Sequence, residues 1–353
     1  MVYYISSENT PARISFLEAT LRGIAPDGKD YMPCEITPFP RAFFNNIHEM
    51  ALKDIAYIVS NALVGHEIDA ASLKSIIFQS MDADLPLSET DTDIFNMAVP
   101  GIRNISTKFF GKVLNHISAT SGNDMPLLIL SEITRHDAKD TASALALVDG
   151  AVSFLLSPAR TLPKHIRDFI ESVSPMVHLT EVHGSPAQCA HMLREALSDK
   201  TLNGSYRITT ANSLNPAVML ARTSIFFHAI ARISALRRQK GYVDSNAMGA
   251  GIVVAISPEI SEAATALDMA IKAGAPINRI IYDDNPGEAL RREIRPKELG
   301  LFLKICNDEA VSEAMPQHSN ADRISATFPA LKRHMIKILN SNHNQNKLFN
   351  YGK

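Results

Sequence analysis

The sequence predicts an α/β protein whose parallel sheets are covered by helices. Between about residues 127 and 197, short apolar runs alternate with segments of helical spacing. A second unit, residues 252–281, contains a strand, a turn, a helix and another strand. Strands that alternate with helices form parallel sheets, and buried parallel strands are almost continuously apolar. With 353 residues, 46% of them apolar, the chain can bury a core large enough for two or three domains.

The first part of the chain, residues 1–95, is predicted to be a mainly helical cap. Apolar residues recur at helical spacing over Ala42–Leu63 and Asp69–Gln79, and Asp69 suits the N-cap of the second helix. The acidic stretch Asp82–Asp93 contains Pro86 and is expected to be a solvated linker. We therefore expect the sheets to begin after this segment.

The rest of the chain divides into two predicted α/β domains. Residues 96–205 are expected to form the smaller one, with strands and helices at Leu127–Leu130, Asp140–Leu147, Ala151–Leu156, Pro163–Val173, Val177–Val182 and Pro186–Leu197. Residues 206–353 are expected to form the other, with elements at Pro216–Arg238, Ile252–Ile256, Glu262–Ala273, Ile277–Ile281 and Leu301–Ile305.

Composition excludes several classes of function. A formal charge of −2 gives no reason to expect nucleic acid or an anionic membrane as a partner. The N-terminus lacks a basic segment followed by an apolar one, and we find no run of about 18 apolar residues, so a cytoplasmic protein is expected. The spacing of the histidines and of the three cysteines fits no metal site, and we expect reduced thiols at Cys34, Cys189 and Cys306.

The turn of the second unit carries the strongest information on chemistry. A turn from strand to helix can bind a phosphate on its backbone N–H groups at the helix N-terminus. Here residues 257–262 have the sequence SPEISE, without glycine and with a proline that has no N–H. Glu259 and Glu262 add negative charge, and each like-charge contact costs on the order of 1–4 kcal/mol. We therefore predict that this turn does not bind a phosphate.

Four segments, in the same order along the chain, resemble the threonine synthase family of pyridoxal phosphate (PLP) enzymes. The first segment is the N-terminus, where residues 3–7 (YYISS) and 23–33 (GIAPDGKDYMP) are similar to the opening of the family. The second is residues 211–215 (ANSLN), which are similar to its "(A/V)NSIN" motif. The third segment is the unit at 252–281, and the fourth is GLFL at residues 300–303. The resemblance implies fold type II, the architecture of the tryptophan synthase β-subunit, with a helical N-terminal cap. It also implies that the large domain is truncated between Ile294 and Leu299.

The resemblance also defines what the turn has lost. The family seats the cofactor phosphate on the sequence Ser-Gly-Asn-Phe-Gly-Asp. Aligned without gaps, the serine of that motif falls on Pro258 and its glycines fall on Glu259 and Glu262. We therefore expect a lost phosphate cup at Pro258, Glu259, Ser261 and Glu262. This departure from the family motif predicts that the chain does not bind PLP.

The resemblance names a candidate for the lysine that forms the Schiff base. Residues 107–111 (TKFFG) are similar to the family's "AFKDFG", which places Lys108 at the position of the catalytic lysine. Phe109 stands where the family has aspartate. Lys108 is thus either a working Schiff-base residue, a vestigial one, or a solvated lysine near a helix start.

Two further sites follow from the same resemblance. Lys139, Asp140 and Thr141 can be aligned with the substrate loop "ATSGDTGAA" if a short insertion is allowed; without it the family's glycines fall on Arg135 and Ala138. Asn212, Ser213 and Asn215 correspond to a segment next to the cofactor. From the residues alone, Asn215 followed by Pro216 also suits an ordinary helix N-terminus.

Two functions remain open at this point. The first is a threonine synthase-like pseudoenzyme without PLP that acts by binding or regulation, with an authentic threonine synthase or another protein as partner. The second is a PLP-dependent lyase that converts O-phosphohomoserine to threonine and phosphate, or carries out a related phospho-amino-acid reaction. The second function needs a replacement phosphate site, for which the sequence offers Arg135, His136, Lys139 and Arg160.

Overall fold

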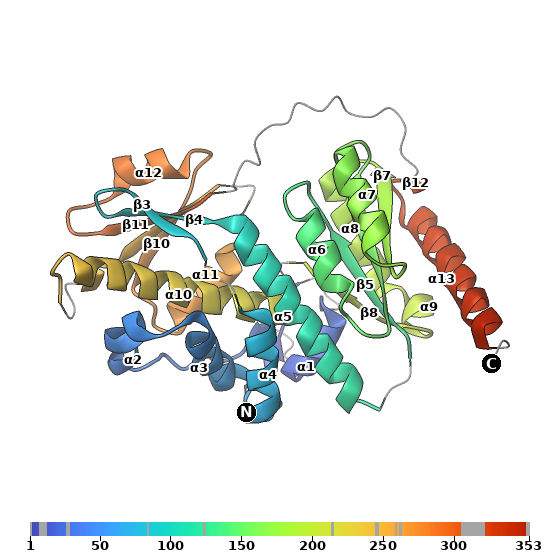
Figure 1. Cartoon of the computed structure of the whole chain (residues 1–353), viewed down its shortest axis with the longest axis horizontal. Helices are drawn as coiled ribbons and strands as arrows, with labels where there is room; N and C mark the ends of the chain where they lie inside the picture. Colours follow the sequence, from blue (N-terminus) through green and yellow to red (C-terminus); the bar gives the residue numbers. More distant parts are fainter. Residues whose placement is uncertain are drawn as a thin grey trace.

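The computed structural model describes residues 2–6, 13–25, 29–82, 85–122, 125–212, 215–243, 247–257, 260, 263–304 and 322–350, without the side chains of 99–101, 322 and 342–350. Two five-stranded sheets lie side by side, with the long helices α5 (Val99–Thr120) and α10 (Pro216–Gln239) between and beneath them (Figure 1). The predicted α/β architecture with parallel sheets covered by helices is confirmed.

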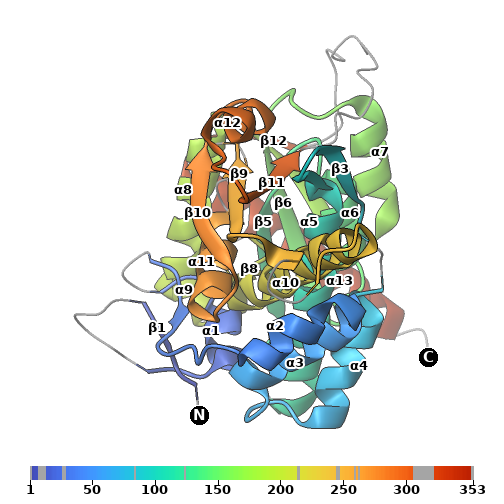
Figure 2. The ribbon, with the colours of Figure 1, turned by 90° about the vertical axis from the view of Figure 1, so that its left-hand side faces the viewer.

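A helical cap precedes the sheets. It consists of α1 (Phe16–Arg22), α2 (Arg41–Asn46), the short 3-10 helix η1 (Ile47–Glu49), α3 (Leu52–Val64) and α4 (Ala70–Ser80), with a two-stranded ladder of β1 (Tyr4–Ile5) and β2 (Met32–Pro33). Helices α2 to α4 lie below α10 (Figures 1 and 2). Asp69 is the N-cap of α4, as predicted. The single helix predicted over Ala42–Leu63 is wrong, because the chain is extended at Met50 and Ala51.

The first sheet has the strand order β10-β9-β11-β4-β3. Its strands are β3 (Leu87–Asp91), β4 (Ile94–Ala98), β9 (Ile252–Ile256), β10 (Ile277–Tyr282) and β11 (Leu299–Lys304). All neighbours are parallel except β3 and β4, which form an antiparallel hairpin. The solvated linker predicted over Asp82–Asp93 is therefore wrong for its second half. β3 is a mostly exposed edge strand, whose polar side chains face water.

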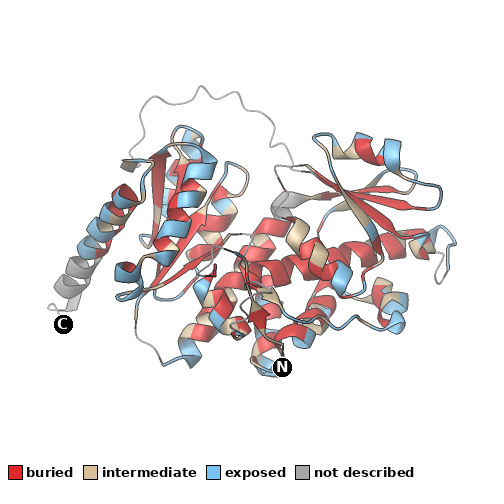
Figure 3. Ribbon diagram, turned by 180° about the vertical axis from the view of Figure 1, so that it is seen from behind, coloured by how far each residue is buried: buried red, intermediate tan, exposed pale blue. Residues whose placement is uncertain are grey.

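The second sheet is parallel throughout, in the order β12-β7-β6-β5-β8. Its strands are β5 (Leu127–Glu132), β6 (Ala151–Pro158), β7 (Val177–His183), β8 (Arg207–Thr210) and β12 (Asp322–Ser325). Its connections are α6 (Ala138–Leu145), α7 (Lys164–Val173), α8 (Pro186–Ser198) and α9 (Lys200–Asn203). The central strands of the sheets, such as β9 and β5, are buried, whereas the edge strands β3 and β10 are partly exposed (Figure 3).

The two sheets are interleaved along the chain. β3 and β4 pair with strands that follow residue 250, whereas β8 and β12 join the sheet built from residues 127–183. Each sheet thus combines strands from both sides of a boundary predicted at residue 95 or 205. The division into domains 1–95, 96–205 and 206–353 stays a prediction.

The remaining helices complete the layers. α11 (Ala264–Lys272) packs with α10 on one face of the first sheet, and α12 (Pro286–Glu293) packs on the other. α13 (Phe328–Asn350) packs beside α8 on the second sheet. Among the described residues, α10 alone is long and apolar enough to cross a membrane, but 94% of its most apolar window is buried inside the protein. It is a core helix, since most of its residues are buried and its apolar side chains belong to one large hydrophobic cluster.

Candidate functional site

A cleft of about 390 Å³ opens at the carboxyl ends of β5 and β8. Ligands of open α/β sheets commonly bind at this edge, because the strands end there and the following helices begin there. The helices α5, α6, α8 and α10 all contribute residues to its wall. The described wall carries three arginines, Arg103, Arg194 and Arg222, and two carboxylates, Glu132 and Asp137.

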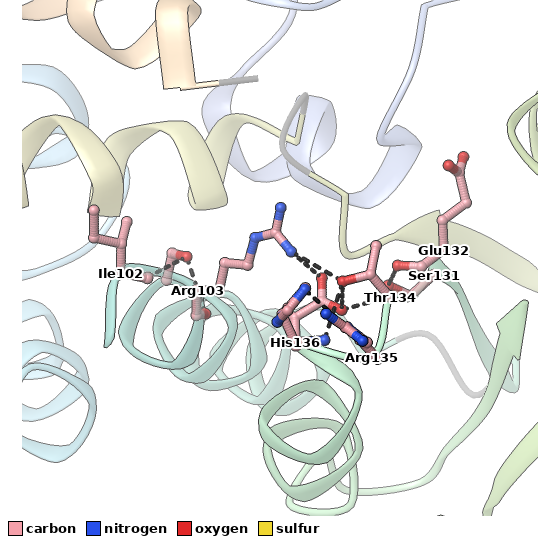
Figure 4. Close-up of polar contacts among 9 residues, drawn as sticks. Ile102, Arg103, Ser131, Glu132, Thr134, Arg135 and His136 are labelled. Atoms are coloured by element: carbon pink, nitrogen blue, oxygen red, sulfur yellow. Dashed lines mark hydrogen bonds and ion pairs between the residues drawn. The ribbon is translucent and has the colours of Figure 1, made fainter. Parts of the chain in front are cut away.

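Arg103 reaches across the cleft from α5. Its Nη1 donates to Asp137 Oδ2 at 2.8 Å and to Thr134 Oγ1 at 3.3 Å. Figure 4 shows its side chain extending toward Thr134 and the loop that carries Arg135 and His136. Only 8% of Arg103 is exposed, so this ion pair is weakly screened by solvent.

Asp137 organises the loop between β5 and α6. Its Oδ1 accepts hydrogen bonds from Thr134 N at 2.6 Å and from Thr134 Oγ1 at 2.9 Å, while its Oδ2 accepts from Arg103. Asp137 is also the N-cap residue of α6. The negative charge therefore sits at a helix N-terminus and holds the loop against α5.

The other two arginines come from different helices. Arg222 lies two turns into α10 and is only 6% exposed, although it lines the cleft. Arg194 lies on α8 and is exposed at the rim. Its positive charge opposes the burial that raises the pKa of Asp30. The wall also carries hydroxyl side chains, on Thr107, Ser131, Thr141 and Thr265.

A second hollow of about 330 Å³ adjoins the first and shares Arg103, Glu132 and Asp137 with it. Arg135 and His136 line it, and Arg135 Nε donates to His136 Nε2 at 3.1 Å. Cys189 also lies on its wall, but burial, and then the charge of Glu132, raise the pKa of the thiol to about 11. The thiol is therefore protonated at neutral pH and is a poor nucleophile.

The structure places Lys108 away from the described cleft wall. α5 begins at Val99, so Lys108 lies in the helix interior and not at its start. Asn104, four residues earlier, donates to Asp140 Oδ1 at 3.0 Å, and Asn115, seven residues later, donates to the backbone oxygen of Leu147 at 3.1 Å. Residues at these spacings share one helix face. The stripe that contains Lys108 therefore faces α6, whereas Arg103 and Thr107 face the cleft.

The three predicted substrate-loop residues separate in the structure. All of them lie on α6, but only Thr141 is part of the cleft wall. The Lys139 ammonium lies 5.7 Å from the centre of the Phe169 ring, and Asp140 binds Asn104. Of the cationic residues predicted for a replacement phosphate site, Arg135 and His136 line the adjoining hollow, and Lys139 and Arg160 line neither described cavity.

Asn212 lines the cleft, whereas Asn215 is fully buried behind it. Asn215 Oδ1 accepts from Ala217 N at 3.0 Å, which makes Asn215 the N-cap of α10. Its Nδ2 donates to the backbone oxygens of Thr20 at 2.9 Å and Thr210 at 3.0 Å. Asn215 thus ties α1, β8 and α10 together. Ser213 lies outside the described residues.

The predicted lost phosphate cup lies outside the described residues, because Pro258, Glu259, Ser261 and Glu262 are not described. The strand β9 before it and the helix α11 after it are both present. Within the described ranges, no group of three or more His, Cys, Asp or Glu side chains is placed to hold a metal ion.

Sequence reasoning missed the arginines of the cleft. One signal was available for Arg222, a charged residue in a long apolar helix, because a buried arginine must be paired or functional. Arg103 and Thr107 are four residues apart and so share a helix face. Neither their spacing nor the composition of the helix reveals which part of the protein that face contacts.

The described residues fit PLP poorly. The wall described here has arginines and hydroxyls that can meet an anionic group, but it contains no lysine for an internal Schiff base.

Comparison with known proteins agrees with the fold. Residues 3–81 match the family described as threonine synthase N terminus. Threonine synthase of Saccharomyces cerevisiae is 24% identical over 251 residues, which cover 65% of this chain and 49% of the yeast protein. Threonine synthase of Escherichia coli is 19% identical over 323 residues, or 90% of this chain and 71% of that protein. The chain spans about half the length of the threonine synthases of Saccharomyces cerevisiae and Schizosaccharomyces pombe.

Solved structures give the same result. Threonine synthase from Escherichia coli superimposes with a TM-score of 0.77 at 15% identity, covering 95% of this chain and 99% of that chain. PLP-bound threonine synthase from Brucella melitensis gives a TM-score of 0.65 at 18% identity, covering 80% of this chain and 60% of that one.

The fold and the cleft at its strand ends thus define a protein of the fold type II architecture, the fold of PLP enzymes. Within that class, this chain is similar to the threonine synthases: residues 3–81 match their N-terminal segment, and the overall fold is shared with the enzyme from Escherichia coli.

Proposed function

We propose that this threonine synthase-like protein acts by binding and does not carry out PLP catalysis. The observation that carries the proposal is the direction of the α5 stripe that contains Lys108. Asn104 and Asn115 bind residues of α6 and of the loop after it. A Cβ on Gly111 would lie 3.1 Å from Val148 Cγ2, so this residue of the stripe also packs against the α6 side.

A Schiff base requires the lysine amine to reach the aldehyde carbon of the cofactor. The stripe of Arg103 and Thr107, and not that of Lys108, faces the cleft. Rotation of α5 about its axis would bury Asn104 and Asn115 against new neighbours and break their hydrogen bonds. Phe109 and Phe110 are fully buried beside Lys108, which opposes such a rotation further.

The sequence of residues 257–262 supports the same proposal. Two glutamates and a proline stand where the family presents backbone N–H groups to the cofactor phosphate. The PLP-bound threonine synthase from Brucella melitensis, which has a similar fold, favours the alternative function as a lyase. The lyase that converts O-phosphohomoserine therefore serves as the alternative outcome of the test.

The test is absorbance spectroscopy of the purified chain after incubation with PLP. We expect no internal-aldimine band, and no difference between the native chain and Lys108→Ala. We also expect no inorganic phosphate release from O-phosphohomoserine. An aldimine band that disappears in Lys108→Ala, or phosphate release, would overturn the proposal in favour of the lyase.

The proposal includes a protein partner in the cytoplasm. The partner is an authentic threonine synthase or another protein, and we expect the contact to involve the N-terminal cap, where residues 3–81 match the family model. Size-exclusion chromatography of the chain mixed with a threonine synthase from the same cell should give a common peak. Separate elution at micromolar concentrations would count against this partner.

A further inference from the structure

We infer that the protein has a small-molecule site separate from the cleft, at the amino end of β8, which binds a carboxylate with an apolar body. A hollow of about 600 Å³ lies there. Its described wall comes from α1, from the residue pair before β5, from the ends of α8 and α9, and from the start of β8. This volume suits a metabolite-sized ligand. The cleft lies at the opposite, carboxyl end of β8, so the two cavities are distinct.

Much of the wall is apolar. Ile24 and Ile208 are buried members of the hydrophobic cluster that covers the second sheet, and Leu197 and Tyr206 pack against the same cluster. The hollow therefore brings an edge of the core into contact with water. A ligand with an apolar body would cover this edge, and removal of apolar surface from water favours binding.

The half-buried Arg207 gives the hollow its charge. Its Nε donates to the backbone oxygen of Met125 at 3.0 Å, and its Nη1 donates to Ser121 Oγ at 3.4 Å. Both partners are neutral, and within the part of the chain that the structure describes no carboxylate forms an ion pair with Arg207. A guanidinium carries five N–H donors, and a carboxylate is the anion that two of them can meet in one plane. Arg207 can therefore hold the carboxylate of a ligand.

Glu18 favours a carboxylate over a phosphate as that group. It is the one carboxylate on the described wall, and it pairs with Arg22 one turn further along α1. This pair is neutral as a whole and partly exposed, so Arg207 supplies the charge that a ligand meets. A phosphate dianion would be repelled by Glu18 more strongly than a singly charged carboxylate.

β8 connects this hollow with the cleft. Ile208 lines the hollow, whereas Asn212, four residues later, lines the cleft. The oxygen of Thr20 on α1 accepts hydrogen bonds from Thr209 Oγ1 at 2.7 Å and from Asn215 Nδ2 at 2.9 Å. A ligand held between α1 and the start of β8 would therefore also restrain the N-terminus of α10 beside the cleft. The site is thus placed to regulate what the cleft binds.

The experiment is calorimetric titration of the whole chain with 3-phenylpropanoate and with its uncharged amide, 3-phenylpropanamide. The two probes share one apolar body, so the difference between them measures the contribution of the carboxylate. We expect saturable binding of 3-phenylpropanoate and about tenfold weaker binding of the amide. Arg207→Met should weaken the carboxylate about tenfold, the equivalent of one hydrogen bond to a charged group, and leave the amide unchanged.

Ser198 tests whether the probe binds in this hollow. Its exposed side chain lines the wall at the end of α8. Ser198→Asp should repel the carboxylate and weaken it severalfold, whereas Ser198→Asn, of the same size, should not. These variants keep Arg207, so they decide the question even if circular dichroism shows that Arg207→Met does not fold. Arg291→Met removes an exposed ion pair with Asp91 and should bind both probes as the native chain does.

The inference is overturned if 3-phenylpropanoate does not bind, if the amide binds equally well, or if Ser198→Asp and Ser198→Asn bind alike. Hydrogen exchange tests the link to the cleft: bound 3-phenylpropanoate should slow exchange in peptides that cover β8 and the first turn of α10, and unchanged exchange there would overturn the link. An aldimine band with PLP would overturn the proposed function alone, because Arg207 and Ser198 lie outside the cleft wall.

Discussion

His178 shows how one half-buried side chain links stability to pH. It lies on β7 with its ring centre 5.5 Å from that of Phe154, and Phe154 also contacts His334 of α13. Burial, and then the charge of His334, lower the pKa of His178 below its ordinary value of 6.5. The folded chain therefore takes up a proton here less readily than the unfolded chain.

The sign of the pH effect follows from that difference. The contribution to stability is complete above about pH 6.5, and it is lost as the pH falls toward the folded pKa, because the unfolded chain binds the proton first. We expect the free energy of unfolding in urea to fall between pH 7.5 and 5, and less so in His178→Phe. The exposed His191 is the control, and equal slopes in His178→Phe and His191→Phe would contradict the prediction.

Lys108 shows the limit of a motif at the scale of one residue. The sequence TKFFG located a lysine on a helix at the family position, and the structure does contain that helix. The side chain nevertheless belongs to the stripe that packs on α6, because Asn104 and Asn115 bind there. Successive residues of an α-helix are rotated by about 100° around its axis. A motif match therefore fixes the position of a residue in the chain but not the surface that its side chain faces.

At the scale of elements, the N-terminus of α10 joins three parts of the fold. Asn215 caps the helix and donates to the backbone oxygens of Thr20 and Thr210. Thr209 Oγ1 also donates to the oxygen of Thr20, at 2.7 Å. The cap is therefore also the joint between α1 and β8.

Asn215→Ala should lower the free energy of unfolding by about 2 kcal/mol, because it removes a cap and leaves buried carbonyl groups without that donor. Asp69→Ala is the control: Asp69 caps the exposed start of α4, through Ala71 N and Ser72 N, and its loss should cost about 1 kcal/mol. Chemical denaturation measures both. An Asn215→Ala chain as stable as Asp69→Ala would show that the joint adds nothing to the cap.

At the scale of the whole molecule, the last described elements complete the second sheet. β12 pairs with β7, and Arg323 Nε on β12 donates to the buried Glu181 at 3.0 Å. Arg167 of α7 lies 3.5 Å from the other oxygen of Glu181. α13 covers the sheet with Leu331, Met335 and Leu339. The second sheet therefore depends on a segment that is far from its other strands in the sequence.

A chain that ends at Lys304 should lose about 5 kcal/mol or more of stability, since each buried large apolar side chain contributes about 1.5–3 kcal/mol. It should also bind a dye specific for exposed apolar surface. A chain that ends at Ser341 keeps the described contacts of α13 and serves as the control. Equal melting temperatures for the two shortened chains would show that the second sheet does not depend on β12 and α13.

The sequence by itself determined the fold class, most strands and helices after residue 125, and the resemblance to threonine synthases. These follow from apolar periodicity and from motifs, which are properties of neighbouring residues. The cap at Asn215 was also predictable, because an Asn-Pro pair before an apolar helix is a local signal.

Only the tertiary structure decided which strands share a sheet, which face of α5 meets the cleft, and that Arg103, Arg194 and Arg222 meet at one wall. The three arginines are far apart in the chain, and Arg103 pairs with Asp137, 34 residues away. Local propensity contains no information on such pairs, because they arise from the order in which strands join and from the packing of helices over them.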